Sequence, residues 1–524
     1  LLALFGSTVV PFQYAGLTSG RVTRGLRFSD AEEYPVRDIP DYFAFLKKQG
    51  IISDPAERKA EIEKQVGDLY ASIKAAEKID SGLLDEVTNL VEAPTALLGN
   101  FNEDHLNLPS EVLVGVMKKH QRYFPVAQPS GALMPHFITI RNGGQERLDI
   151  VAHGNEEVIQ ARFSDAAFFI NEDNKHSLED FIAREDSLTF HPKLGSMLDK
   201  TKRIVSLTEK LGSELKLSPA EMKTALEAAQ LCKADLVSKM VIEMTSLQGT
   251  IGKYYALQRG KDAAVAQAIE EHYQPRFAGD KSPASRAGLV VGLADRLDSL
   301  VGLFTAGMAP SGTKDPFGLR RAAIGLVQNL IQADIPLNLQ KIVSRAAAQL
   351  PLESNPKDTQ ACLDFIAGRL EQMLLEEGYA YDVINAVLAA QGDNPAQAMQ
   401  AIRELSQWVK RDDWRDILPA YSRCVRITRA EKVTYNISAG HFKESQESAL
   451  YEAVRTAKDK VSANPTVENL LGSLLPVIPA INAFFDTVLV MDENQAVREN
   501  RLGLLQAVSN LAAGIVDLSK LEGF

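Results

Sequence analysis

Apolar residues recur at three- and four-residue intervals through most of this chain, and this spacing predicts helices. From about residue 155 onward almost no other pattern is present. We expect helices at about 197–212, 219–246, 262–272, 284–306, 316–333, 337–350, 358–377, 395–411, 414–437, 442–461, 466–490 and 493–519. Turn-forming stretches such as 309–313 and 391–395 separate them.

The first 150 residues carry a mixed pattern. Thr8–Phe12 and His136–Ile140 are strand-like because they are rich in β-branched and aromatic residues, whereas Pro55–Lys78 and Pro109–His120 have helical spacing. Asn155 precedes two glutamates and is expected to cap the next helix. We therefore predict a multidomain, mainly α protein, with an α+β N-terminal region at 1–150, a helical domain at 151–350, a helical linker at 351–410 and a helical domain at 411–524.

The composition is that of a folded protein, with 524 residues, 45% hydrophobic and 24% charged. Its net charge of -11 means that binding to nucleic acid must rest on local basic patches. Cys232, Cys362 and Cys424 form no CxxC pair, which argues against a thiolate zinc site and fits a reducing, cytoplasmic location. No apolar run approaches the roughly 20 residues that span a bilayer, so we expect no membrane partner. The start at Leu1 has no initiator Met and no basic n-region, and we expect a chain that is cut inside an element.

A first basic stretch combines the cations of Lys118, Lys119 and Arg122 with the rings of Tyr123 and Phe124. Cations bind phosphates and rings stack on unpaired bases, so RNA contact is one interpretation. The same residues also suit a helix C-terminus, where the helix dipole favours cations, followed by a buried strand. The residues alone leave both interpretations open.

A second basic stretch is a loop that carries Lys314, followed by Asp315-Pro316, which is expected to begin a helix. Arg320 and Arg321 follow one turn later. A helix N-terminus beside cations suits a phosphate, although the glycine and lysine spacing is not that of a Walker loop. A solvated loop is the alternative.

The most basic local stretch places Arg423, Arg426, Arg429 and Lys432 three residues apart. On a helix such a row drifts by about 60° per step and forms a winding ribbon. On an acidic chain this concentration of charge predicts a surface for a phosphate backbone, and a solvated helix face is the alternative.

The last predicted helix carries Arg498 and Arg501 three residues apart, with apolar positions 502, 505, 508 and 511 as its core seam. Asp492 or Asn494 is expected to cap it.

Scattered acids at Asp235, Glu271, Asp295 and Asp298, together with His272, are placed in a way that is similar to HD-type metal phosphohydrolases, which use His, a His-Asp pair and Asp as ligands. None of the eight histidines precedes an Asp, and Lys233-Ala-Asp stands where the pair would be. One histidine and a few carboxylates make a poor set for a transition metal, which favours a metal-free relic. A metal-dependent phosphohydrolase acting on nucleotides or RNA is the alternative.

Longer strings resemble the β subunit of the bacterial two-subunit glycyl-tRNA synthetases. They follow the family's order over essentially the whole chain and lie at residues 162–195, 247–249, 273–280, 294–298 and 314–321. Arg21–Phe28 resembles a segment well inside that family, so we expect the N-terminal part to be missing. Leu26 stands where we expect His in the family.

The resemblance implies an HD-like domain in the middle of the chain and a DALR-type anticodon-binding domain at its end. It implies a glycine–tRNA ligase that attaches glycine to tRNA(Gly) with ATP and Mg, and whose catalytic site is on a separate α subunit. This chain is then expected to hold no catalytic residue, cofactor or metal, to bind tRNA(Gly), and to join the α subunit in an α2β2 assembly. A scaffold that binds the α subunit without touching RNA is the remaining alternative. The expected tRNA-binding residues are Arg423, Arg426, Arg429, Arg498, Arg501, Lys118, Lys119, Arg122, Lys314, Arg320 and Arg321.

Overall fold

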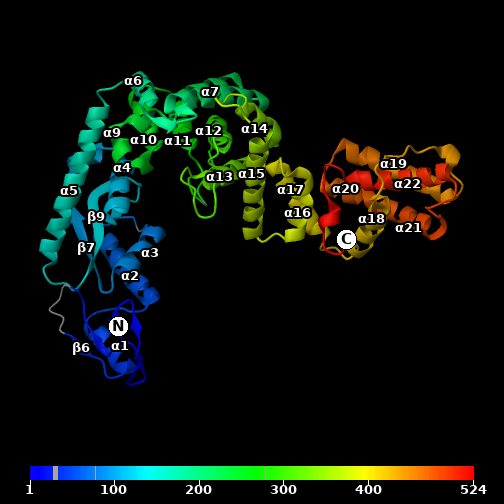
Figure 1. The fold of residues 1–524 in the computed structure, drawn as a ribbon. Coiled ribbons are helices and arrows are strands. Elements are labelled where there is room, and N and C mark those ends of the chain that lie inside the picture. The colour runs from blue at the N-terminus through cyan, green and yellow to red at the C-terminus, as the bar shows by residue number, and fades with distance from the viewer. Residues whose placement is uncertain (28–32, 77, 278) are drawn as a thin grey trace. The chain divides into compact units, whose positions relative to one another are not determined.

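The computed structural model describes residues 1–27, 33–76, 78–277 and 279–524 (Figure 1). The chain divides into two compact units, one formed by Leu1–Phe181 with Asp235–Tyr255 and the other by Ile182–Ala234 with Ala256–Phe524. The division does not follow the expected boundary at residue 150, because helix α5 (Leu148–Asp173), which begins there, belongs to the first unit. The predominance of helices confirms the predicted mainly α fold.

The first unit combines short strands with helices. Its strands are β1 (Leu4–Phe5), β2 (Thr8–Val9), β3 (Gln13–Tyr14), β4 (Leu17–Thr18), β5 (Val22–Thr23), β6 (Tyr34–Pro35), β7 (Pro94–Asn100), β8 (Phe124–Ala127) and β9 (Leu133–Asn142). Its helices are α1 (Ile39–Lys48), α2 (Pro55–Ser72), α3 (Ser81–Leu90), α4 (Ser110–Gly115), α5 and α9 (Lys239–Glu243), and α6 (Leu178–Arg184) and α10 (Thr250–Gln258) lie across its boundaries. The strand predicted at His136–Ile140 lies within β9. Residue 77 of the helix predicted at 55–78, and Phe28 of the motif that begins at Arg21, lie outside the described residues.

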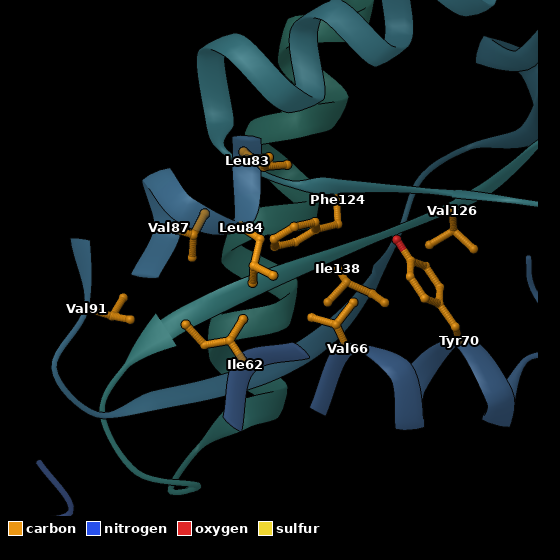
Figure 2. Packing of buried hydrophobic residues seen from close by; sticks show 10 residues of the cluster. All are labelled: Ile62, Val66, Tyr70, Leu83, Leu84, Val87, Val91, Phe124, Val126 and Ile138. Carbon is orange, nitrogen blue, oxygen red and sulfur yellow. The ribbon is translucent and has the colours of Figure 1, made fainter. Parts of the chain in front are cut away.

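The core of the first unit lies between a three-stranded antiparallel sheet, in the order β7-β9-β8, and helices α2 and α3. Figure 2 shows Ile138 of β9 among side chains from α2, α3 and β8. The neighbouring Phe137 points to the opposite face, as alternation along a strand requires, and stacks on Tyr123 with 4.6 Å between the ring centroids. Gly99 is needed beside it, because a Cβ there would lie 2.2 Å from the Phe137 ring.

The second unit is built around α12 (Arg286–Thr305), which is almost wholly buried and, among its many apolar residues, also buries Arg296 and Asp298. Around it pack α7 (Met197–Glu214), α8 (Pro219–Leu231), α11 (Ala263–Glu271), α13 (Leu319–Gln332), α14 (Leu339–Ala347) and α15 (Pro356–Glu376). The hairpin of β10 (Thr189–His191) and β11 (Gly195–Ser196) precedes α7. Helices α16 (Tyr381–Gln391) and α17 (Pro395–Trp408) follow, and the Trp408 indole N–H donates to Glu468 over 2.6 Å.

The last part of the second unit is a bundle of five helices. They are α18 (Trp414–Thr428), α19 (Ser445–Ala463), α20 (Val467–Leu474), α21 (Ile478–Thr487) and α22 (Gln495–Ser509). Helix α22 packs against α18 and α19, and α19 packs against α20 and α21. We refer to this bundle as the C-terminal domain.

One stretch of this domain, Val467–Thr487, is long and apolar enough to cross a membrane by length and composition, and 44% of its most apolar window is buried. The stretch is broken into α20, a short 3-10 turn and α21 at Pro476 and Pro479. Because core helices of folded domains pass the same criterion, this is weak evidence for a membrane span.

The three cysteines lie apart in the fold and form no disulfide. Cys232, Cys362 and Cys424 are free and buried. Burial raises the pKa of each thiol, to about 12 for Cys362 and Cys424.

Several predicted helix boundaries are wrong, and local contacts explain why. Asn155 does not cap a helix, because α5 already begins at Leu148; instead the Asn155 amide donates to the Val151 carbonyl and accepts from the Tyr123 hydroxyl. The helix predicted at 414–437 ends at Thr428. The chain that follows is irregular, and side chains of α22 bind its backbone.

Other predicted helices are interrupted or were missed. The stretch 219–246 breaks after Leu231, and a new helix, α9, is capped by the hydroxyl of Ser238. The stretch 466–490 is divided by its prolines, which cannot donate a helical hydrogen bond. The last helix ends at Ser509 and is followed by short turns. Helix α16 was not predicted.

Candidate RNA-binding surface

Helix α18 presents a row of exposed arginines. Ile417, Tyr421 and Cys424 turn inward and are buried, which leaves Arg423 and Arg426 on the solvent side. The exposed Arg429 follows as the C-terminal cap residue, and the exposed Lys432 lies in the irregular segment beyond the helix. The predicted ribbon therefore exists, but its last member is not helical.

Two of these arginines lie over aromatic rings. The Arg423 guanidinium is 4.3 Å from the ring centroid of Phe485, and that of Arg426 is 5.7 Å from the centroid of Phe524. Within the described ranges, no ion pair with a carboxylate involves Arg423, Arg426 or Arg429. A cation–π contact orients a guanidinium without neutralising it, so these charges are available to an anionic partner.

Arg501 does not belong to this surface, and its expected role as an RNA contact needs correction. Its side chain is only 4% exposed and donates from Nε to Glu447 Oε1 over 2.9 Å. Its NH1 group donates to the Leu489 carbonyl over 2.8 Å and lies 3.0 Å from Asp492 Oδ2. Burial by itself would raise the pKa of Glu447, but the hydrogen bond from Arg501 and those from backbone amides hold it below its usual value. Arg501 therefore fixes the loop between α21 and α22.

Arg498, one turn earlier on α22, is only half-buried. Its NH1 group donates to the Asp492 carbonyl over 3.4 Å, which leaves most of its donors unused by that contact. Asn494 is the cap of α22, since its side chain accepts from the amides of Ala496 and Val497. Of the two expected candidates, Asp492 instead serves the contact with Arg501.

The stretch around residue 120 follows the helix-end interpretation. Lys118 pairs with Asp80, and Arg122 Nε lies 2.9 Å from Glu86 Oε1. Tyr123 and Phe124 are buried, so their rings are not presented to RNA. Lys119 is exposed at the end of a π-helical turn (Val116–Gln121) that continues α4.

The loop before α13 differs from its predicted form in one important respect. The helix begins at Leu319 and not at Pro316, and the carboxylate of Asp315 accepts from the amides of Leu319 and Arg320 over 2.8 and 2.9 Å. An anion from the chain itself thus occupies the helix N-terminus, so a phosphate would have to displace it. Arg320 donates to the Gly312 carbonyl, whereas Lys314 and Arg321 are exposed.

A buried network of charges occupies the centre of the second unit, where the resemblance placed an HD-like site. Asp295 lies between two ammonium groups, with its Oδ2 2.8 Å from Lys233 Nζ and its Oδ1 2.9 Å from Lys200 Nζ. Lys200 also lies 3.1 Å from Asp298, whose other oxygen accepts from Arg203 over 2.6 Å. Burial opposes the charge on Asp295, but both lysines hold the pKa of Asp295 well below its usual value.

The histidine of this network is neutral. His272 Nδ1 lies 2.6 Å from the Ile269 carbonyl and Nε2 lies 2.9 Å from Lys233 Nζ. Because the carbonyl and the ammonium group fix these roles, Nδ1 carries the proton and Nε2 accepts. Burial and the charge of Lys233 both lower the pKa of His272, well below its usual value.

These residues do not fit a metal site. Each carboxylate oxygen of Asp295 lies against an ammonium group, from Lys200 or from Lys233. The lone pair of His272 Nε2 also accepts from Lys233, so it is not available to a metal ion. Asp235 accepts from the amides of Gly249 and Gly252 over 2.5 and 3.0 Å. In the part of the chain that the structure describes, no group of three or more His, Cys, Asp or Glu side chains is arranged to hold a metal ion. The donor set therefore gives no support to a metal phosphohydrolase.

Comparison with known proteins assigns the class. Residues 417–521, which include the arginine row of α18, match the family model of the DALR anticodon binding domain. This match identifies a DALR-type domain in the last part of the chain. Residues 1–389 match the family model described as glycyl-tRNA synthetase beta subunit. The chain belongs to the glycyl-tRNA synthetase β subunit family, which confirms the resemblance and places it among the aminoacyl-tRNA synthetases, a class of ligases.

Curated relatives support this assignment over the whole chain. It is 40% identical to the glycine–tRNA ligase beta subunit of Moorella thermoacetica and 37% identical to that of Bacillus subtilis; each alignment covers 99% of this chain and 76% of the relative. It is 38% identical to the chloroplastic/mitochondrial glycine–tRNA ligase 2 of Arabidopsis thaliana over 100% of this chain. The chain spans 49% of the length of that plant relative.

Proposed function

We propose that this chain is the tRNA-binding β subunit of a heteromeric glycine–tRNA ligase, which attaches glycine to tRNA(Gly) with ATP. The observation that carries the proposal is the exposed row of Arg423, Arg426 and Arg429, free of carboxylate partners among the described residues, inside the region that matches an anticodon-binding domain. Cations arranged in a row along one surface bind a phosphate backbone, and stacked rings such as Phe485 add contacts for bases. In this assignment α18 receives the anticodon arm.

The α subunit is the proposed partner, in an α2β2 assembly that acts in the cytoplasm. In that assembly the α subunit holds ATP, Mg and glycine, and this chain holds none of them. The names of the bacterial relatives as beta subunits support a separate partner. The plant relative supports it as well, because a protein named as the ligase itself is about twice the length that this chain covers.

The other cations are proposed as secondary contacts. Lys314 and Arg321 are exposed beside α13, and Lys119 is exposed beyond α4. Lys118, Arg122 and Arg320 are already engaged by carboxylates or carbonyls of the chain, so RNA has to compete with those contacts. Arg498 stays among the proposed anticodon-arm contacts, and Arg501 does not.

The test is competition binding of the purified chain to a tRNA(Gly) transcript against a non-cognate tRNA at two salt concentrations. Salt-sensitive binding that prefers tRNA(Gly) is the expected result. Absence of RNA binding by this chain, together with retention of α-subunit binding, would replace the proposal by the scaffold alternative.

A further inference from the structure

A cavity of about 450 Å³ opens in the C-terminal domain, and none of the residues proposed above as RNA contacts lines it. Four parts of the chain line it, namely the segment Thr434–Ile437, the end of α19 with Pro465 just beyond it, the second half of α22, and the turns that follow α22 at residues 510–515. Its apolar lining includes Val461, Ala507 and Leu511, and its polar lining includes Asn436, Lys458 and Asn510.

One wall of this cavity is held rigidly against α22. The Tyr435 amide donates to Gln506 Oε1 over 2.9 Å, and Gln506 Nε2 donates to the Val433 carbonyl over 2.8 Å. At Gly503 the segment approaches so closely that a Cβ would lie 3.0 Å from the Tyr435 carbonyl oxygen. The shape of the cavity is therefore set before any ligand arrives, which reduces the entropy lost on binding.

Three polar side chains of the lining have no partner among the described residues of the chain. Among the described residues, the side chains of Asn436, Lys458 and Asn510 make no hydrogen bond or ion pair within the protein. All the residues that line the cavity are described, and the ammonium of Lys458 is the only charged side chain in this lining. The cavity thus offers an apolar surface, amides that both donate and accept, and one cation.

This chemistry selects a flat, neutral ring that carries hydrogen-bonding edges and is attached to an anion. Side-chain amides pair with the edges of nucleobases, and apolar and aromatic walls hold their faces. A carboxylate in the lining would repel a phosphate, but none is present among the lining residues. Arg429 and Lys432 immediately precede the wall along the chain, so the basic row continues to the cavity.

We propose that this cavity binds one unpaired nucleobase of the RNA, with the adjoining phosphate at Lys458. The inference rests on the proposed function and deepens it, because it adds a pocket for a single base to a surface that otherwise contacts the backbone. The expected ligand is a loop nucleotide turned out of its stack.

The experiment uses the full chain and a hairpin with the sequence of the anticodon arm of tRNA(Gly), in which each loop nucleotide is replaced in turn by an abasic one. The variant Ala507→Phe fills the cavity, Lys458→Ala removes its cation, and Lys460→Ala is the matched control on the same helix. We expect one abasic position to weaken binding about tenfold, Ala507→Phe to weaken it about as much, and the two together to cause no further loss. Lys458→Ala weakens binding several-fold, whereas Lys460→Ala binds like the wild type.

Equal effects of every abasic position in the wild type and in Ala507→Phe, with unchanged affinity in Lys458→Ala, would overturn the pocket. Lys458 is exposed, so its variant answers the question even if Ala507→Phe unfolds the domain. If the pocket is overturned but Arg426→Glu still weakens binding of the hairpin, the proposed function stands without the pocket. If the hairpin does not bind the wild type at all, the proposed function fails and the pocket fails with it.

Discussion

Arg501 Nε lies 2.9 Å from Glu447 Oε1 across the interior of the C-terminal domain, and both side chains are buried. Helix α22 supplies the arginine and the first turn of α19 the glutamate. The pair thus joins two helices that lie far apart in the sequence, and this explains why Arg501 is unavailable to RNA.

We expect Arg501→Ala to lower the free energy of unfolding by about 3–5 kcal/mol, because it leaves Glu447 buried without a counter-charge. Both tryptophans, Trp408 and Trp414, lie in or next to this domain, so urea unfolding followed by tryptophan fluorescence reports it. Arg498→Ala is the matched control, with an expected change within about 0.5 kcal/mol. A similar loss in both variants would contradict the assigned difference.

Charge reversal at the end of α18 should weaken RNA binding in a salt-dependent way. For Arg426→Glu with Arg429→Glu, we expect lower affinity for tRNA(Gly). The slope of log affinity against log salt should also become shallower, by the amount that corresponds to the loss of about two phosphate contacts. Lys223→Glu with Lys357→Glu changes the net charge equally on exposed residues of other helices. If the control flattens the plot as much, the effect is one of net charge and not of this surface.

Lys233→Met should unfold the second unit more easily, because it removes one of the two ammonium groups that balance Asp295. The expected loss is about 3–5 kcal/mol, whereas Lys202→Met on the exposed side of α7 should change little. Thermal unfolding measures both. A chelator added to the wild type should leave its midpoint unchanged, and a marked fall would return the metal-dependent alternative to consideration.

The buried His272 should make stability depend on pH in a defined window. Its folded pKa lies well below the ordinary value, first because of burial and then because of Lys233, so the unfolded chain binds the proton more readily. The contribution of the neutral His272 to the free energy of unfolding is therefore complete above about pH 6.5. It declines by up to about 1.4 kcal/mol per pH unit as the pH falls below that value. Asp295, whose pKa is also lowered, acts only below about pH 4.

Urea unfolding of the wild type and of His272→Gln between about pH 7.5 and pH 5 measures this contribution. The glutamine keeps an oxygen that accepts from Lys233 but does not titrate, so the stability of the variant should fall less steeply below about pH 6.5. Parallel curves would show that the fall has another origin.

Periodicity along the chain was sufficient to predict most helices of the second unit, because their apolar seams repeat within a few residues. It did not separate Arg498 from Arg501, which are three residues apart on one helix. The partner that draws Arg501 inward, Glu447, comes from a distant helix, and no local signal marks it. The same holds for Phe485 beneath Arg423, because the two residues lie on different helices.

Helix boundaries were predicted less well where a side chain from outside the helix determines where the helix begins or ends. Asp315 was correctly assigned to the start of α13, but it caps from outside the helix, so the predicted start was early. The backbone beyond Thr428 leaves the helix because Gln506 and Asn500 bind it, and these residues belong to α22. The rings of Tyr123 and Phe124 were open to two interpretations because burial depends on the sheet that forms around them.

The three buried cysteines have a practical consequence for measuring RNA binding in solution. Thiol-reactive labels are electrophiles that the thiolate attacks, and burial keeps Cys232, Cys362 and Cys424 protonated and covered. A single cysteine introduced on the surface, for example Lys460→Cys, would then be the one thiol that a fluorescent maleimide reaches in the folded chain. The native protein therefore accepts a site-specific reporter of RNA arrival without first being stripped of its own cysteines.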